Sequence, residues 1–208
     1  MKQNNIIQNL QKLFPSPKCE LEYESNYQLL VAVILSAQCT DKRVNIVTRE
    51  LFKDYGTPEA MLTLTQSQLE EKIHSCGFYR NKAKNILSMT KDLIDKFDGQ
   101  VPNDLAKMQT LAGVGRKTAN VVLAEAFKGD AIAVDTHVLR VSNRLGLVTT
   151  DNPEVCERAL MQTFDRKHWS KLHLQMVHFG RYICKSQRPE CAKCPFKKIC
   201  TTDKQHKI

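Results

Sequence analysis

Four cysteines near the carboxyl-terminal end are the residues whose type and spacing point most directly to chemistry. Cys184, Cys191, Cys194 and Cys200 follow the pattern C-x₆-C-x₂-C-x₅-C. No single helix could aim all four at one point, and two prolines in the segment favour a loop. Four thiolates suit either tetrahedral zinc or a four-iron, four-sulfur cluster. Structural zinc more often uses two separated C-x-x-C pairs, and only one is present here, which favours iron–sulfur.

The cysteine segment is also rich in positive charge. Residues 184–208 contain seven basic and two acidic residues. A metal-pinned loop carrying Lys193 could form a rigid phosphate-binding surface, and a solvated tail is the alternative, which we prefer for Lys204 and Lys207. The other four cysteines are scattered along the chain, and we expect each to be a small buried hydrophobe.

A second stretch, LAGVGRKTANVVL at 111–123, combines a glycine turn with a strong helix start. Gly113 and Gly115 permit a turn whose backbone can approach another molecule closely. The helix expected from Arg116 onward presents free N–H groups and a positive dipole end, which suits a phosphate. Lys117 lies in its first turn and could be a phosphate contact, a surface charge or a nucleophile.

Composition limits the class of protein. The 208 residues carry a formal charge of +9 with a pI of about 9.2, which favours an anionic partner. A hydrophobic content of 42% can build a core in one large or two small domains. The amino-terminal stretch lacks an apolar signal core, and the longest aliphatic run, 29–35, is too short to span a bilayer. We expect a soluble cytoplasmic protein, in which many cysteines favour metal binding over disulfides.

Helical periodicity is the main structural signal along the chain. Thr57-Pro58 is typical of a helix start, and Thr65 with Gln68 resembles a capping box. The apolar block 27–38 could be a buried strand or a buried helix. No alternating strand pairs with hairpin turns are evident, so the fold is expected to be all-α. Helices are predicted near 6–14, 41–55, 81–97, 116–126, 135–145, 153–164 and 168–183.

These residues together resemble the endonuclease III family, the helix-hairpin-helix DNA glycosylases and abasic-site lyases of base excision repair. The resemblance rests on the glycine turn, on VDTHVLR at 134–140 and on the four-cysteine pattern. LLVAVILSAQCTD at 29–41 and GFYRNKA at 77–83 extend it over nearly the whole chain.

The resemblance implies two helical domains with a DNA-binding cleft between them. Residues 19–129 would form a six-helix domain that ends in the helix-hairpin-helix. Residues 1–18 plus 130–208 would form a discontinuous helical domain whose four cysteines hold a [4Fe-4S] cluster in the loop 184–200. The partner would be double-stranded DNA containing an oxidised pyrimidine or an abasic site. We expect a monomer in the bacterial cytosol or nucleoid, without membrane association.

The resemblance also assigns the chemistry, with Lys117 as nucleophile and Asp135 as its carboxylate partner. A lysine amine suits this route because a hydroxyl cannot form the imine that precedes strand cleavage. Burial and a helix N-terminus favour the neutral amine, whereas a nearby carboxylate opposes it. Asp135 is therefore expected mainly to accept a proton and stabilise positive charge on the sugar. From each residue alone we would interpret Asp135 as a helix N-cap and Lys117 as a surface charge. The two residues together favour the catalytic roles instead.

Several further residues would contact DNA by the same resemblance. Gln38 would fill the gap left by the extruded nucleotide, and Phe78 would wedge the opposite side. Phe78 departs from the leucine usual in the family, and a core aromatic is the alternative. Ala112 replaces a usual proline, and Cys39 beside Gln38 is another departure. The remaining candidate contacts are the turn residues Gly113, Val114, Gly115 and Arg116, the loop residue Lys193, and His137, which could instead be a satisfied structural histidine.

Three rival readings remain. An adenine glycosylase of the same superfamily would carry serine in place of Lys117 and an additional carboxy-terminal domain. A non-catalytic iron–sulfur DNA-binding or redox-sensing protein would cleave no lesion. A zinc-stabilised binding module would contain no iron.

Overall fold

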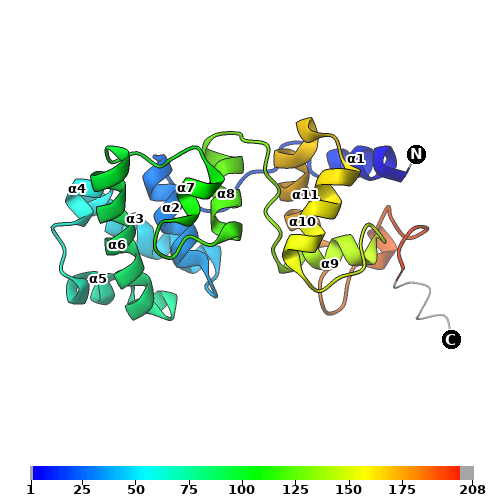
Figure 1. Cartoon of the computed structure of the whole chain (residues 1–208). Helices are drawn as coiled ribbons and strands as arrows, with labels where there is room; N and C mark the ends of the chain where they lie inside the picture. The colour runs from blue at the N-terminus through cyan, green and yellow to red at the C-terminus, as the bar shows by residue number, and fades with distance from the viewer. Residues whose placement is uncertain (1, 202–208) are drawn as a thin grey trace. The chain divides into compact units, whose positions relative to one another are not determined.

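The computed structural model describes residues 2–201, and within that range all regular structure is helical (Figure 1). The all-α prediction is thereby confirmed. The chain divides into two compact units. We call residues 19–128 the central unit, and residues 1–18 with the chain from 129 onward the discontinuous unit. No helix of the described range is long and apolar enough to cross a membrane.

The central unit is organised around the helix α2 (Asn26–Ser36), which packs against α3, α6 and α8. Nine of its eleven residues are buried, as expected for a helix that is apolar on every side. The block 27–38 is therefore helical as far as Ser36, followed by a turn, and the strand alternative is wrong. The unit continues through α3 (Asp41–Tyr55), α4 (Pro58–Met61), α5 (Gln66–Ile73), the 3₁₀ turn η1 (His74–Cys76), α6 (Tyr79–Phe97), α7 (Leu105–Gln109) and α8 (Arg116–Ala126).

Side-chain caps set the starts of most of these helices. Thr65 and Gln68 form the expected capping box, with both reciprocal hydrogen bonds present. Asp104 caps α7, a five-residue helix that the periodicity did not reveal because it is barely more than one turn long. α7 is the first helix of the hairpin whose second helix is α8, and the two pack together.

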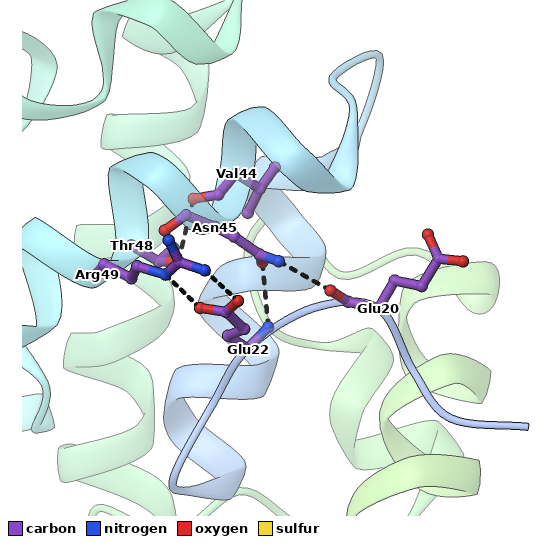
Figure 2. Close-up of polar contacts among 6 residues, drawn as sticks. All are labelled: Glu20, Glu22, Val44, Asn45, Thr48 and Arg49. Carbon is purple, nitrogen blue, oxygen red and sulfur yellow. Dashed lines mark hydrogen bonds and ion pairs between the residues drawn. The ribbon is translucent and has the colours of Figure 1, made fainter.

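The segment that enters the central unit is fixed onto α3 before α2 begins, as Figure 2 shows. The Asn45 side chain donates to the Glu20 carbonyl at 2.8 Å and accepts from the Glu22 backbone amide at 3.1 Å. Arg49 forms a bidentate ion pair with the Glu22 carboxylate. The ion pair is exposed and contributes little, so the half-buried Asn45 bonds are the main anchor.

The discontinuous unit brings the amino-terminal helix α1 (Lys2–Leu13) against α11 (Trp169–Tyr182). Gly180 of α11 lies close to α9 (Thr136–Arg144), since a Cβ at this glycine would come within 2.8 Å of the His137 Cβ. The unit also contains α10 (Pro153–Thr163) and the 3₁₀ turns η2 (Arg166–His168) and η3 (Cys191–Lys193). Its core includes Ile6, Leu10, Val138, Val141, Leu160, Met176, Phe179 and Phe196.

Candidate functional site

The turn between α7 and α8 has the backbone that the two glycines predicted. Gly113 adopts a φ of +76°, and a Cβ there would lie 2.9 Å from the Asn85 Cβ, so only glycine fits. Gly115 has an ordinary φ of −79°, and a Cβ there would meet nothing within 4 Å. Val114 is buried and anchors the turn between them. Gly115 is the N-cap of α8 and no side chain caps this helix start, so its first amides can serve an outside acceptor.

Lys117 lies on the exposed side of this helix start. It occupies the first turn of α8, and its side chain is accessible to solvent. Within the described part of the chain its ammonium group makes no hydrogen bond or ion pair. An amine in this position can meet a ligand whose phosphate binds the adjacent amides.

Asp135 is the N-cap of α9 in the discontinuous unit, which was one of the two interpretations of its sequence context. Its Oδ1 accepts hydrogen bonds from the backbone amides of His137 and Val138, each at 2.8 Å. Both capping bonds end on the same oxygen, so Oδ2 is not used for capping. The capping role therefore leaves one carboxylate oxygen for chemistry.

A buried histidine that sequence reasoning missed lies within electrostatic range of Asp135. His173, on α11, is 2% exposed, and burial lowers its pKa to about 4 although the Asp135 charge acts in the opposite direction. The imidazole is therefore neutral at physiological pH. Its helical spacing from Trp169 and Met176 on the apolar face of α11 was the signal that could have identified it as buried.

His137 has partners within its own unit. Its Nδ1 lies 3.1 Å from Nη2 of Arg140, and because a guanidinium only donates, Nδ1 is the acceptor. Burial is the main cause that lowers the His137 pKa, with the Arg140 charge acting in the same direction. A structural histidine is expected to have hydrogen-bond partners within the protein, and His137 has such a partner in Arg140.

Gln38 and Phe78 are both exposed, and both have left-handed backbone conformations, with φ of 53° and 46°. Phe78 is 68% exposed, so the core-aromatic alternative is wrong. Sequence reasoning missed the residue that joins their loops. Lys82 on α6 is buried, and its ammonium group donates to backbone carbonyls from both loops.

The four clustered cysteines line one cavity of about 270 Å³, together with Arg144 of α9. Burial raises the pKa of the Cys194 thiol, and the other three cysteines of the set raise it further because they lie nearby. Arg144 donates to the Cys184 Sγ at 3.4 Å and to the Lys185 carbonyl at 2.8 Å, which ties the loop to α9.

The four thiols are soft donors of the kind that both a tetrahedral zinc ion and an iron–sulfur cluster take, so the space among them bears on the choice. The cavity of about 270 Å³ far exceeds the roughly 10–15 Å³ that a cavity needs, on the same measure, to hold one water molecule. Four soft thiolates around so large a space fit a multi-atom cluster better than one zinc ion.

Lys193 lies in this loop, within η3, with a side chain that is 79% exposed. Its Nζ is 3.2 Å from Glu190 Oε2, and Lys185 pairs with the other oxygen of the same carboxylate at 3.0 Å. The lysines at 204 and 207 lie outside the described residues.

Comparison with known proteins agrees with this geometry. Residues 31–166 match the family described as HhH-GPD superfamily base excision DNA repair protein, so the chain belongs to that superfamily. Within it the chain is a member of the endonuclease III family. It is 48% identical over 197 residues to endonuclease III of Rickettsia conorii, an alignment that covers 95% of this chain and 94% of the relative.

Two solved structures extend the likeness to three dimensions. A non-covalent endonuclease III–DNA complex matches with a TM-score of 0.95 and 46% identity, covering 99% of this chain and 98% of that one. A trapped endonuclease III–DNA covalent intermediate, an estranged-adenine complex, matches with a TM-score of 0.94, the same identity and the same coverage.

Proposed function

We propose that this chain is a DNA glycosylase and abasic-site lyase of base excision repair that removes oxidised pyrimidines from double-stranded DNA. The observation that carries the proposal is the exposed amine of Lys117, in the first turn of a helix whose start no side chain caps. Membership in a family with a trapped covalent DNA intermediate supports covalent chemistry at this amine.

In the proposed reaction the neutral Lys117 amine attacks C1′ of the damaged nucleotide. A C1′–N bond forms to the lysine, and the glycosidic bond breaks with its electrons leaving on the base, which takes up a proton. The sugar ring then opens to a Schiff base, which makes the 2′ proton acidic. Loss of this proton drives β-elimination, the C3′–O bond breaks on the 3′ side of the lesion, and hydrolysis of the imine frees the lysine.

Asp135 is proposed to act through the carboxylate oxygen that does not cap α9. Oδ2 can accept a proton from the attacking amine or stabilise positive charge on the sugar, while Oδ1 keeps the side chain fixed. Lys117 and Asp135 belong to different units. The reaction therefore requires both units to engage the same nucleotide.

DNA binding is proposed to use the two loops and the hairpin turn. The amides of Gly113 and Gly115 would hold a backbone phosphate, because a glycine turn that feeds a helix start presents N–H groups to it. The Val114 amide between them already donates to the Leu111 carbonyl at 3.1 Å. The nucleotide must leave the duplex at a cost of a few kcal/mol. Gln38 would fill the gap and hydrogen-bond the orphaned base, while Phe78 would wedge the other side.

The four loop cysteines are proposed to hold a [4Fe-4S] cluster. When bound, the cluster would fix the loop that carries Lys193, since its thiolate ligands come from both ends of the segment. We expect iron and acid-labile sulfide in the purified protein, lost in Cys194→Ser and retained in the control Cys19→Ser, which lies outside the loop. A colourless protein that contains zinc would support the zinc-module alternative instead.

Borohydride trapping tests the catalytic proposal. Duplexes carrying thymine glycol, an abasic site or an adenine mismatch are incubated with each variant and reduced, and covalent adducts are separated on denaturing gels. Lys117→Ala should form no adduct and cut no strand. Asp135→Asn should react more slowly yet bind DNA nearly as well, because an amide oxygen can still cap α9.

The exposed helix residue Lys53 supplies a matched control, and Lys53→Ala should behave as the parent protein does. A covalent adduct that survives in Lys117→Ala would overturn the assignment of the nucleophile. Base release at the adenine mismatch alone would favour the adenine-glycosylase alternative, and the absence of cleavage at every lesion would favour a non-catalytic binding protein.

A further inference from the structure

Lys82 is a buried lysine whose partners are backbone carbonyls. Its residue exposure is 5%, and its Nζ donates to the carbonyls of Leu35 at 2.8 Å, Ala37 at 2.7 Å and Cys76 at 2.6 Å. An ammonium group has three N–H donors, so these bonds use all of them. Lysine is almost never fully buried unless it is paired. Removing its charge from water costs free energy that only such hydrogen bonds can offset.

The three carbonyls belong to two loops that are far apart in sequence. Leu35 and Ala37 lie at the carboxyl end of α2, and Cys76 ends the turn η1. The Ala37 carbonyl shares a rigid peptide plane with the amide nitrogen of Gln38, so a bond to that oxygen fixes the plane from which Gln38 departs. The second loop is held by a backbone bond as well. The backbone amide of Lys82 donates to the Phe78 carbonyl at 3.1 Å, which fixes the Phe78 backbone to the start of α6.

Both loops are strained where they meet solvent. Gln38 and Phe78 have positive φ values, which non-glycine residues seldom adopt. Gly77 between Cys76 and Phe78 has φ 61° and ψ 152°, a region that is essentially restricted to glycine. Such conformations persist only where the surroundings enforce them. The Lys82 bonds are a local constraint that acts on both loops at once.

We propose that Lys82 is a positioning residue that holds Gln38 and Phe78 at a fixed separation, so that both side chains enter the duplex together. The proposal rests on the roles given above to Gln38 and Phe78 as gap filler and wedge. Loops already held in their working conformation lose less freedom when DNA binds. More of the binding free energy is then available to extrude the nucleotide.

The test separates base extrusion from chemistry. In Lys82→Met, extrusion is followed by the fluorescence of a 2-aminopurine next to thymine glycol in a duplex, alongside single-turnover excision. Both should fall by about tenfold or more, since small misplacements near a reacting group have effects of this size. Borohydride trapping on a single-stranded abasic oligonucleotide needs no extrusion and should stay unchanged.

Two further variants control for folding. Lys84→Met changes an exposed lysine on the same helix and should leave every readout unchanged. Lys82→Gln keeps an N–H donor group and should give an intermediate extrusion defect. If circular dichroism shows that Lys82→Met does not fold, the comparison between Lys82→Gln and the parent protein decides the question. Equal losses in duplex excision and single-strand trapping would overturn the positioning role.

Double variants distinguish this inference from the function on which it rests. If Lys82 acts through the two loop residues, Lys82→Met should add little to the defect of a Gln38→Ala, Phe78→Ala protein, because sites in one network are not additive. A full additional loss in that background would overturn the inference. Failure of the parent protein to form a single-strand adduct would instead overturn the proposed lyase function and leave the loop measurements interpretable.

Discussion

Asp135 shows how one side chain can serve both the fold and a reaction. Its Oδ1 accepts hydrogen bonds from two backbone amides at the start of α9, which have no partner within the helix. A typical N-cap of this kind stabilises a protein by about 1 kcal/mol. The bonds to the helix also fix the direction of Oδ2. A carboxylate held by backbone amides needs no further ordering when substrate arrives, which is the general advantage of a preorganised group.

The buried side chain of His173 predicts how the stability of the protein depends on pH. Burial lowers its pKa from 6.5 in the unfolded chain to about 4 in the folded protein. Between these values the unfolded state binds more protons, so the free energy of unfolding falls as the pH drops from 6.5 towards 4, by about 3 kcal/mol at most. His173→Gln should flatten this part of the pH profile.

The only tryptophan in the chain makes the measurement specific. Trp169 lies four residues before His173 in α11, so its fluorescence during urea titration reports unfolding of the discontinuous unit. Comparing variants at each pH cancels effects common to all of them, such as acid loss of a cluster. The exposed His74→Gln should follow the parent profile. Parallel profiles for His173→Gln and the parent would show that His173 does not titrate in this way.

At the scale of the elements, the hairpin predicts opposite outcomes for its two glycines. Gly113→Ala should destabilise the protein by roughly 1–3 kcal/mol, because the left-handed φ and the contact with Asn85 both reject a Cβ. Gly115→Ala should leave stability almost unchanged, since its φ is ordinary and no atom crowds it. If a phosphate approaches this turn closely, Gly115→Ala should nevertheless weaken DNA binding.

Thermal unfolding and fluorescence anisotropy with an abasic duplex would separate the two effects. Equal stability of the two variants would contradict the backbone argument for Gly113. Unchanged binding by Gly115→Ala would show that DNA phosphate does not approach the turn at this glycine.

How far the sequence predicts these elements depends on the signal each carries. The capping box of Thr65 and the N-cap of Asp135 are local patterns, and both are present. Helix α2 was ambiguous because burial on every side removes periodicity, and α7 was missed because five residues show none. The bonds of the Lys82 ammonium group connect residue 35 with residue 76. A local sequence pattern cannot predict a contact between segments so far apart in the chain.

Charge is the property that belongs to the whole molecule. The chain carries a formal charge of +9, and candidate phosphate contacts lie in both units, at the hairpin turn and in the cysteine loop. Each phosphate neutralised by a lysine or arginine releases bound cations from DNA, so the affinity should fall as salt rises. With about four such contacts, raising the salt from 50 to 200 mM should weaken binding by about 100-fold.

The slope of this salt dependence can test a single residue. If Lys193 contacts a phosphate, Lys193→Ala should reduce the slope of log K against log salt by about one, and weaken binding equally for damaged and undamaged duplexes. Lys53→Ala is the matched control, because Lys53 pairs with Glu50 on its helix much as Lys193 pairs with Glu190. Anisotropy titrations at four or more salt concentrations give both slopes. A slope for Lys193→Ala equal to that of Lys53→Ala would show that Lys193 does not contact a DNA phosphate. A slope near zero for the parent protein would show that phosphate contacts are not the main source of its affinity for DNA.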